Sequence, residues 1–159
     1  MAKRDTPSSS GRRVLAGGVF DLLHPGHVAF LEEAKRLAGE DGELIVVVAR
    51  DETVRRFKRT PIVPEEQRVR MVEALKPVDR AVLGHPSDFS VTLERVRPDV
   101  VVLGPDQEIG EEDVRRWAER AGVECEVVRI RRYEECPLDS TVKIVRRVIE
   151  LWRRGELEV

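Results

Sequence analysis

Two of the three histidines in this 159-residue chain stand close together near its start. The segment GGVFDLLHPGH spans residues 17–27 and places His24 and His27 around a proline and a glycine. Glycines allow a backbone to approach a ligand closely, and imidazoles donate hydrogen bonds to phosphates or carry positive charge where negative charge develops. These residue types therefore suggest a phosphate site.

The same histidines have simpler explanations. His24 could end a turn and His27 could begin a helix, without any ligand. An H-x-x-H pair also binds zinc when a cysteine or carboxylate joins it. Cys125 and Cys136 lie far along the chain and no second ligand pair is visible, so we predict no resident metal.

The elements around the pair favour the phosphate site. Short apolar runs predict five strands, at residues 13–17, 43–50, 80–84, 99–104 and 125–130. Helical periods fall at residues 27–39, 64–76, 88–97, 111–122 and 139–155. This alternation predicts an α/β fold, a single Rossmann-like, doubly wound domain with a five-stranded parallel sheet flanked by helices. The H-x-x-H segment would follow the first strand and begin the first helix, where such sheets bind ligands and helix N-termini bind anions.

The other segments set the limits of the domain. We predict residues 1–12 as a disordered leader, residues 13–154 as the domain and residues 155–159 as a short tail. The basic, proline-containing segment DETVRRFKRTPIVP, residues 51–64, is predicted as a long loop of the kind that often covers a site.

Composition excludes several classes of function. Charged residues make up 36% of the chain but leave a net charge of −2, which is not typical of a nucleic-acid-binding protein. No apolar run approaches the length of a membrane span. With only two cysteines, a reduced, cytoplasmic protein without nucleic-acid or membrane partners is expected, although a disulfide between them stays open.

The segment GGVFDLLHPGH resembles the H-x-G-H signature of the nucleotidyltransferase superfamily, and within it the cytidylyltransferase-like group. The blocks LIVVVARDETV, PIVPEEQRVRMVEALKPVD and LGPDQ most resemble the archaeal FAD synthase family, the FMN adenylyltransferases of that group. The resemblance covers about residues 13–149. It implies transfer of AMP from ATP to FMN, giving FAD and pyrophosphate, with Mg²⁺ or another divalent cation accompanying the triphosphate.

Two other functions stay open. One is a cytidylyltransferase that uses CTP and a small phosphorylated alcohol such as glycerol 3-phosphate. The other is a nucleotide sensor without catalysis, because a fold does not fix a function. Relatives are commonly dimers, so a homodimer is possible, with Trp117 or Trp152 either at the contact or in the core.

The resemblance also implies roles for individual residues. Catalysis would involve His24, His27, Lys58 in the basic loop and Arg68 in the next helix. The implied nucleotide-binding residues are Val19, Phe20, His24, Pro25, Gly26, His27, Asp106, Tyr133, Ser140 and Thr141.

Several of these assignments have plain structural alternatives. Asp106 lies in a Gly-Pro-Asp sequence that favours a turn, and Ser140 could simply cap the last helix. Arg68 could be an exposed helix residue, and a basic loop is often a solvated surface.

Overall fold

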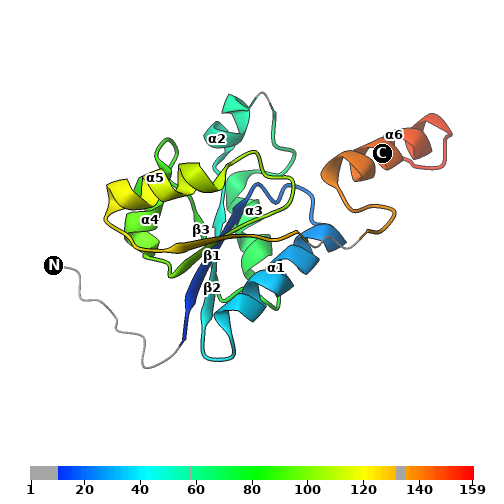
Figure 1. The fold of residues 1–159 in the computed structure, drawn as a ribbon. Helices are drawn as coiled ribbons and strands as arrows, with labels where there is room; N and C mark the ends of the chain where they lie inside the picture. The colour runs from blue at the N-terminus through cyan, green and yellow to red at the C-terminus, as the bar shows by residue number, and fades with distance from the viewer. Residues whose placement is uncertain (1–10, 58, 132–134) are drawn as a thin grey trace.

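Five parallel strands form one sheet, with helices on both of its faces (Figure 1). The computed structural model describes residues 11–57, 59–131 and 135–159. The strands, in sheet order, are β3 (Arg80–Leu83), β2 (Glu43–Val48), β1 (Arg13–Gly18), β4 (Val100–Leu103) and β5 (Glu126–Arg129). The predicted fold class and the five predicted strands are confirmed.

The order of the strands reverses direction between β1 and β4. α1 (Pro25–Ala38) and α3 (Glu65–Glu73) pack on one face, whereas α4 (Phe89–Val96) and α5 (Glu111–Ala121) pack on the other. The neighbours β1 and β4 therefore send their following helices to opposite faces. This is the switch point at which doubly wound sheets bind ligands, at the carboxyl ends of the strands.

The strand sequences explain the two-sided core. Alternate residues of each strand face opposite sides of the sheet, and β2 is almost entirely apolar because both of its faces are covered. Leu31 and Ala34 of α1 are fully buried against one face, and Leu93 of α4 and Val114 of α5 against the other. The interior therefore fixes the strand ends, and with them the loops that carry the expected site.

The predicted loop at residues 51–64 is wrong in its first half, which forms α2 (Asp51–Arg56). Asp51 lies in its first turn and Arg55 and Arg56 in its last, as the helix dipole prefers, and Val54 is buried. Six residues are too short for helical periodicity to be visible in the sequence.

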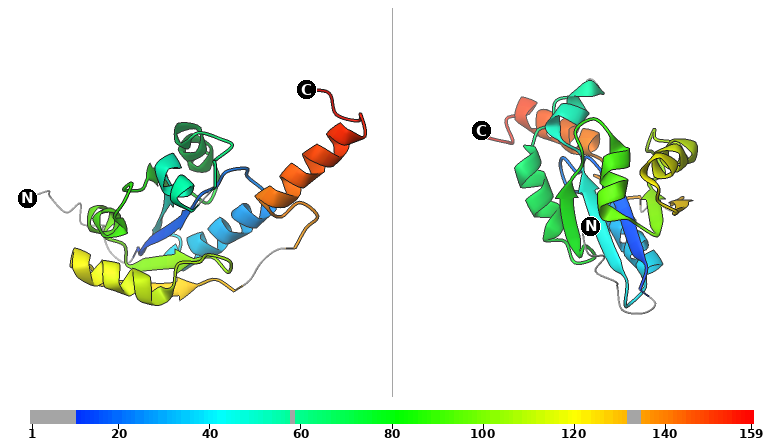
Figure 2. Two further views of the ribbon diagram at one scale, coloured as in Figure 1. Left: turned by 90° about the horizontal axis from the view of Figure 1, so that it is seen from above. Right: turned by 90° about the vertical axis from the view of Figure 1, so that its left-hand side faces the viewer.

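The last helix, α6 (Thr141–Arg153), extends away from the sheet and its covering helices (Figures 1 and 2). None of its residues is buried. Its apolar side chains Val142, Val148, Ile149 and Trp152 are exposed. By contrast, Trp117 packs against Phe89, with ring centroids 5.3 Å apart. Within the described ranges, no helix is both long enough and apolar enough to span a membrane.

Candidate active site

The turn after β1 is built around a bulky residue in an unusual backbone conformation. Phe20 has a φ of 53°, in the left-handed region that large side chains rarely adopt, and it is buried. Its ring covers Gly18, where a Cβ atom would lie only 2.9 Å from the ring. An alanine at residue 18 would therefore force the Phe20 ring to shift, and this close contact shapes the turn that leads to the histidines.

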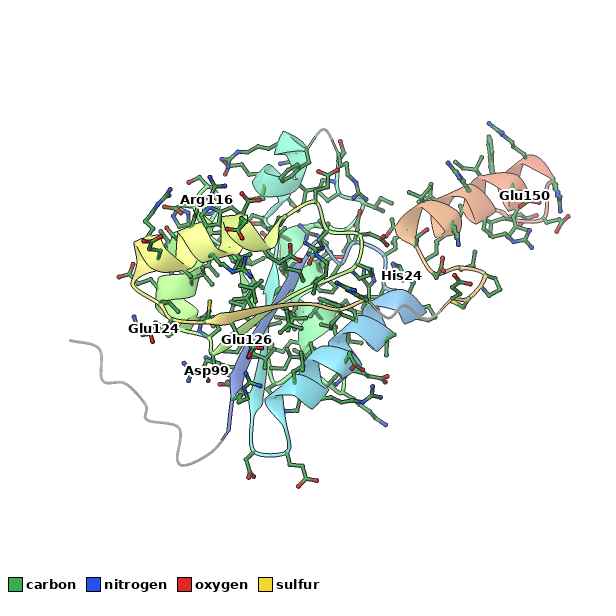
Figure 3. All side chains as sticks on the ribbon, viewed as in Figure 1. His24, Asp99, Arg116, Glu124, Glu126 and Glu150 are labelled. Atoms are coloured by element: carbon green, nitrogen blue, oxygen red, sulfur yellow. The ribbon has the colours of Figure 1, made fainter. Side chains whose placement is uncertain are left out.

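His24 and His27 lie together at the start of α1, where Figure 3 labels His24. The helix begins at Pro25, two residues before the predicted start, because proline suits the first helical position. The two imidazole rings are stacked, with centroids 3.7 Å apart and planes inclined by 25°. The Nδ1 atom of each ring is buried and has no hydrogen-bond partner among the described residues. Buried polar atoms are nearly always paired, so this arrangement is suited to a bound ligand or water.

Burial controls the charge of the pair. Loss of solvation lowers the pKa of His24 below 6.5, while the nearby Asp139 carboxylate acts in the opposite direction. Burial, followed by the effect of His24, lowers the pKa of His27 from 6.5 to about 4. Both imidazoles are therefore mainly neutral at pH 7 in the free protein. A polyanionic ligand would raise both pKa values because it favours the charged form.

The start of α6 meets the H-x-x-H turn from the other side. The Thr141 hydroxyl donates to the Leu22 carbonyl at 3.5 Å. Ser140 is the N-cap residue, and its hydroxyl accepts a hydrogen bond from the backbone N–H of Lys143 at 3.2 Å. Asp139 is buried and pairs with the Lys143 ammonium at 2.6 Å. Two helix N-termini, each with a positive dipole end, thus lie near one another.

The loop that follows β4 is held against the end of β1. Gln107 accepts from the Gly104 N–H at 2.7 Å and donates to the Gly17 carbonyl at 2.8 Å. Arg129 donates to the Gly104 carbonyl at 2.7 Å. Asp106 belongs to this loop and is exposed. The loop is therefore fixed at the switch point while its carboxylate remains available to a ligand.

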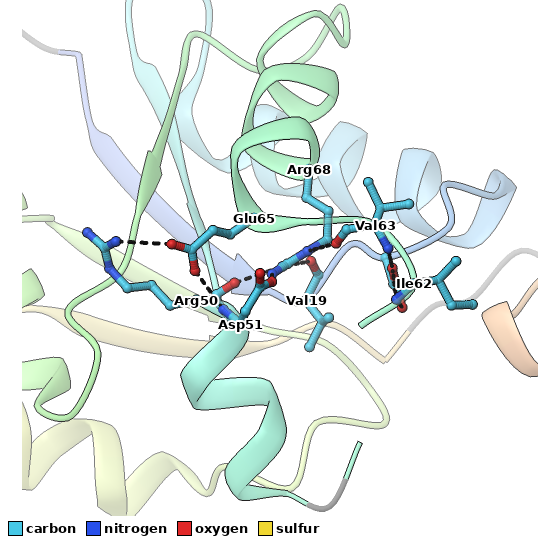
Figure 4. Close-up of polar contacts among 9 residues, drawn as sticks. Val19, Arg50, Asp51, Ile62, Val63, Glu65 and Arg68 are labelled. Atoms are coloured by element: carbon cyan, nitrogen blue, oxygen red, sulfur yellow. Dashed lines mark hydrogen bonds and ion pairs between the residues drawn. The ribbon is translucent and has the colours of Figure 1, made fainter. Parts of the chain in front are cut away.

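Arg68 is enclosed by protein. Its side chain is 0% exposed, and it donates to the carbonyl oxygens of Val19 at 2.8 Å, Ala49 at 2.7 Å and Val63 at 2.8 Å (Figure 4). Its remaining contact is an ion pair with Asp51 at 2.6 Å. The guanidinium thus joins the segments after β1, after β2 and before α3. The alternative that Arg68 is an exposed helix residue is therefore wrong, because folding encloses its side chain.

Asp21 ties the same region to the basic loop. Its carboxylate accepts from the Ile62 N–H at 2.9 Å and from the Val63 N–H at 2.8 Å. Arg59, on the approach to this anchor, is exposed. Lys58 and Tyr133, both predicted site residues, lie outside the described residues, as do residues 1–10 of the predicted leader.

The structure brings most of the predicted residues to one edge of the sheet. Those in the turn after β1 and at the start of α1 lie beside those at the start of α6, where Thr141 contacts Leu22. Sequence reasoning missed Asp21, Gln107, Arg129 and Asp139. Asp21 lies inside the segment GGVFDLLHPGH and Gln107 inside LGPDQ, so their place in these motifs could have identified them. Arg129 has no local pattern that distinguishes it from other arginines.

A family model described as cytidylyltransferase-like matches residues 15–147. The chain belongs to the cytidylyltransferase-like family. Within this family it is 80% identical over 149 residues to an FAD synthase of Methanopyrus kandleri, a match that covers 94% of this chain and 99% of that protein. It is 50% identical to an FAD synthase of Methanothermobacter thermautotrophicus, over 86% of this chain and 91% of the relative.

A solved structure supports the same cytidylyltransferase-like architecture. The crystal structure of a lipopolysaccharide core biosynthesis protein from Thermoplasma volcanium superposes with a TM-score of 0.73 and 42% sequence identity. The match covers 79% of this chain and 100% of the Thermoplasma volcanium chain. A second structure, from Archaeoglobus fulgidus, has a TM-score of 0.58 at 20% identity and shows the fold alone.

Proposed function

We propose that this chain is an FMN adenylyltransferase, which transfers AMP from ATP to FMN and releases pyrophosphate. The observation that carries the proposal is 80% identity to an FAD synthase along nearly the whole length of both chains. In the reaction, a phosphate oxygen of FMN attacks the α-phosphorus of ATP. The new P–O bond forms as the bond between the α-phosphorus and the oxygen that bridges to the β-phosphate breaks. That bridging oxygen leaves as part of pyrophosphate.

The H-x-x-H turn suits this chemistry. Phosphoryl transfer needs positioning and stabilisation of charge, and no covalent nucleophile on the protein. In our proposal the N-terminus of α1 and the backbone at Val19 and Phe20 bind the triphosphate. His24 and His27 stabilise the negative charge that grows as pyrophosphate leaves, because triphosphate binding shifts both imidazoles towards their charged form.

In this proposal the start of α6 forms the second side of the substrate site. Ser140 and Thr141 lie beside the H-x-x-H turn, because Thr141 contacts Leu22. Asp106, which is exposed in the loop after β4, binds the sugar or base of the nucleotide. Lys58 keeps the role of a phosphate-binding cation that its position in the basic loop suggests.

The divalent cation belongs to the nucleotide substrate. No group of three His, Cys, Asp or Glu side chains within the described ranges is placed to hold a metal ion. In this proposal an Mg²⁺ ion enters with the triphosphate, because Mg²⁺ is commonly held by substrate phosphates, water and one or two carboxylates. When bound, the ion neutralises part of the phosphate charge.

The exposed face of α6 supports the proposal of a homodimer. Val148, Ile149 and Trp152 are between 41% and 60% exposed on a helix that packs on no sheet face. Apolar patches of this kind in a folded chain are commonly interfaces. In the proposed dimer a second copy covers this helix.

The proposal keeps the cytoplasmic location that the composition led us to expect. Cys125 and Cys136 form no disulfide.

The function is tested by incubating the protein with Mg²⁺, either ATP or CTP, and either FMN, glycerol 3-phosphate or phosphocholine. Pyrophosphate release and nucleotide products are then measured. FAD formed only from ATP and FMN supports the proposal. Products from CTP and an alcohol phosphate would establish the cytidylyltransferase alternative, and no pyrophosphate from any pair would favour the sensor.

A further inference from the structure

Both chain neighbours of Phe20 are held by hydrogen bonds to residues far along the chain. The Val19 carbonyl accepts from Arg68 at 2.8 Å, and the Asp21 carboxylate accepts from the Ile62 and Val63 N–H groups (Figure 4). Phe20 itself has the left-handed φ of 53°. Such a conformation costs about 1–3 kcal/mol and persists only where the surrounding structure over-determines it. The two anchors provide that constraint.

The ring of Phe20 contacts His27, which we propose is catalytic. Its centroid lies 5.2 Å from that of His27, at an interplanar angle of 52°. His27 also stacks on His24. The position of the His27 ring is therefore bounded by a phenyl ring that would move if the turn relaxed to an ordinary backbone conformation.

The composition of the anchors indicates a role beyond stability. A buried guanidinium is costly to desolvate, and an apolar side chain would often stabilise a fold equally well. Here Arg68 and Asp21 make hydrogen bonds to backbone groups of three separate segments, all at the carboxyl edge of the sheet. Directional bonds of this kind fix positions, which apolar packing does less well.

We propose that Asp21 and Arg68 are positioning residues, which hold the strained Phe20 turn so that its ring keeps His27 in place for adenylyl transfer. Neither side chain contacts substrate in this role. Asp21 also holds residues 62 and 63, so the end of the basic loop and the histidine turn share one anchor. The inference rests on the proposed function for its activity readout, although its structural readout does not.

The amino edge of the sheet offers matched controls. Asp79 is also a carboxylate that accepts a backbone N–H, that of Leu44 at 2.7 Å, but it lies at the opposite end of β2. Arg13 donates to the Val96 carbonyl at 2.9 Å at the start of β1. Replacing Asp79 removes this bond together with its ion pair to Lys35 at 2.6 Å, and changing either residue leaves the Phe20 turn untouched.

The test compares Asp21→Ala, Asp21→Asn and Asp79→Ala. We expect Asp21→Ala to lower kcat for FAD formation by about ten- to a hundredfold, as small misplacements of catalytic groups do, with KM for ATP nearly unchanged. Asparagine keeps an oxygen acceptor and should restore most of the rate. Asp79→Ala should lose stability but keep kcat. Equal losses of kcat in Asp21→Ala and Asp79→Ala would overturn the proposal.

A second readout is independent of the reaction. The chain has three histidines, so their ring resonances can be followed by NMR as the pH is varied. The pKa of His27, about 4 in the wild type, should rise towards 6.5 in Asp21→Ala because Phe20 no longer shields the ring. Arg68→Lys should act in the same direction, and Arg13→Lys should not. An unchanged His27 pKa in folded Asp21→Ala and Arg68→Lys would refute the positioning role, whether or not FAD is made.

Discussion

Replacing His27 by asparagine should reduce the loss of stability at acidic pH. In the wild type the folded state disfavours the imidazolium, because burial and His24 lower the pKa of His27 from 6.5 to about 4. The unfolded chain therefore binds more protons than the folded chain between these two values. Stability is highest above pH 6.5 and is lost as the pH falls through this window.

The size of the effect follows from the two pKa values. At 1.36 kcal/mol per pH unit, the wild type loses about 2 kcal/mol of unfolding free energy by pH 5 and about 3 kcal/mol by pH 4 through this one group. Asparagine does not titrate, so His27→Asn lacks this contribution. His24, whose pKa is also lowered, is present in both proteins.

The assay is urea unfolding followed by circular dichroism at several pH values between 7.5 and 4.5, with wild type and His27→Asn measured side by side. The difference between the two unfolding free energies reports the titration of His27 together with its coupling to His24, because the acidic and basic groups that do not touch His27 are common to both proteins. We expect the difference to shift in favour of the variant as the pH falls. A difference that stays constant from pH 7.5 to 4.5 would refute the assignment of a partly buried, neutral His27.

Three further predictions concern the rest of the site and the proposed dimer. Gly18→Ala places a Cβ atom 2.9 Å from the Phe20 ring, so thermal or urea unfolding should show a loss of about 1–3 kcal/mol, and wild-type stability would contradict this packing. Gln107→Ala removes the bonds to the Gly17 carbonyl and the Gly104 N–H and should raise KM for ATP about tenfold, whereas Gln67→Ala on the exposed surface of α3 should not, as steady-state kinetics will show. Trp152→Glu should shift the sedimentation coefficient towards that of a monomer, and an unchanged value would exclude this helix as the contact.

Local sequence patterns were sufficient for the sheet and for the centre of the site. Each strand is a short apolar run, and every crossover helix longer than α2 repeats its apolar residues with a helical period, so both are visible within a short stretch of sequence. The H-x-x-H pair could be placed at the end of β1 for the same reason. The N-cap role considered for Ser140 is confirmed, because capping depends on neighbours a few residues away.

Tertiary structure decided what joins these pieces. Asp21 meets Ile62 across 41 positions of the chain, and Arg68 meets Val19 across 49. No local pattern distinguishes a buried arginine from an exposed one, since both occupy ordinary helical positions. The apolar face of α6 likewise has the periodicity of a core helix, yet no other part of the described chain covers it. The sequence by itself determined which elements form and where the histidines stand, because those depend on near neighbours. Only the folded chain determined that the distant Arg68 guanidinium and the backbone N–H groups of residues 62 and 63 hold the histidine turn in place, because those contacts exist only once the strand ends have come together.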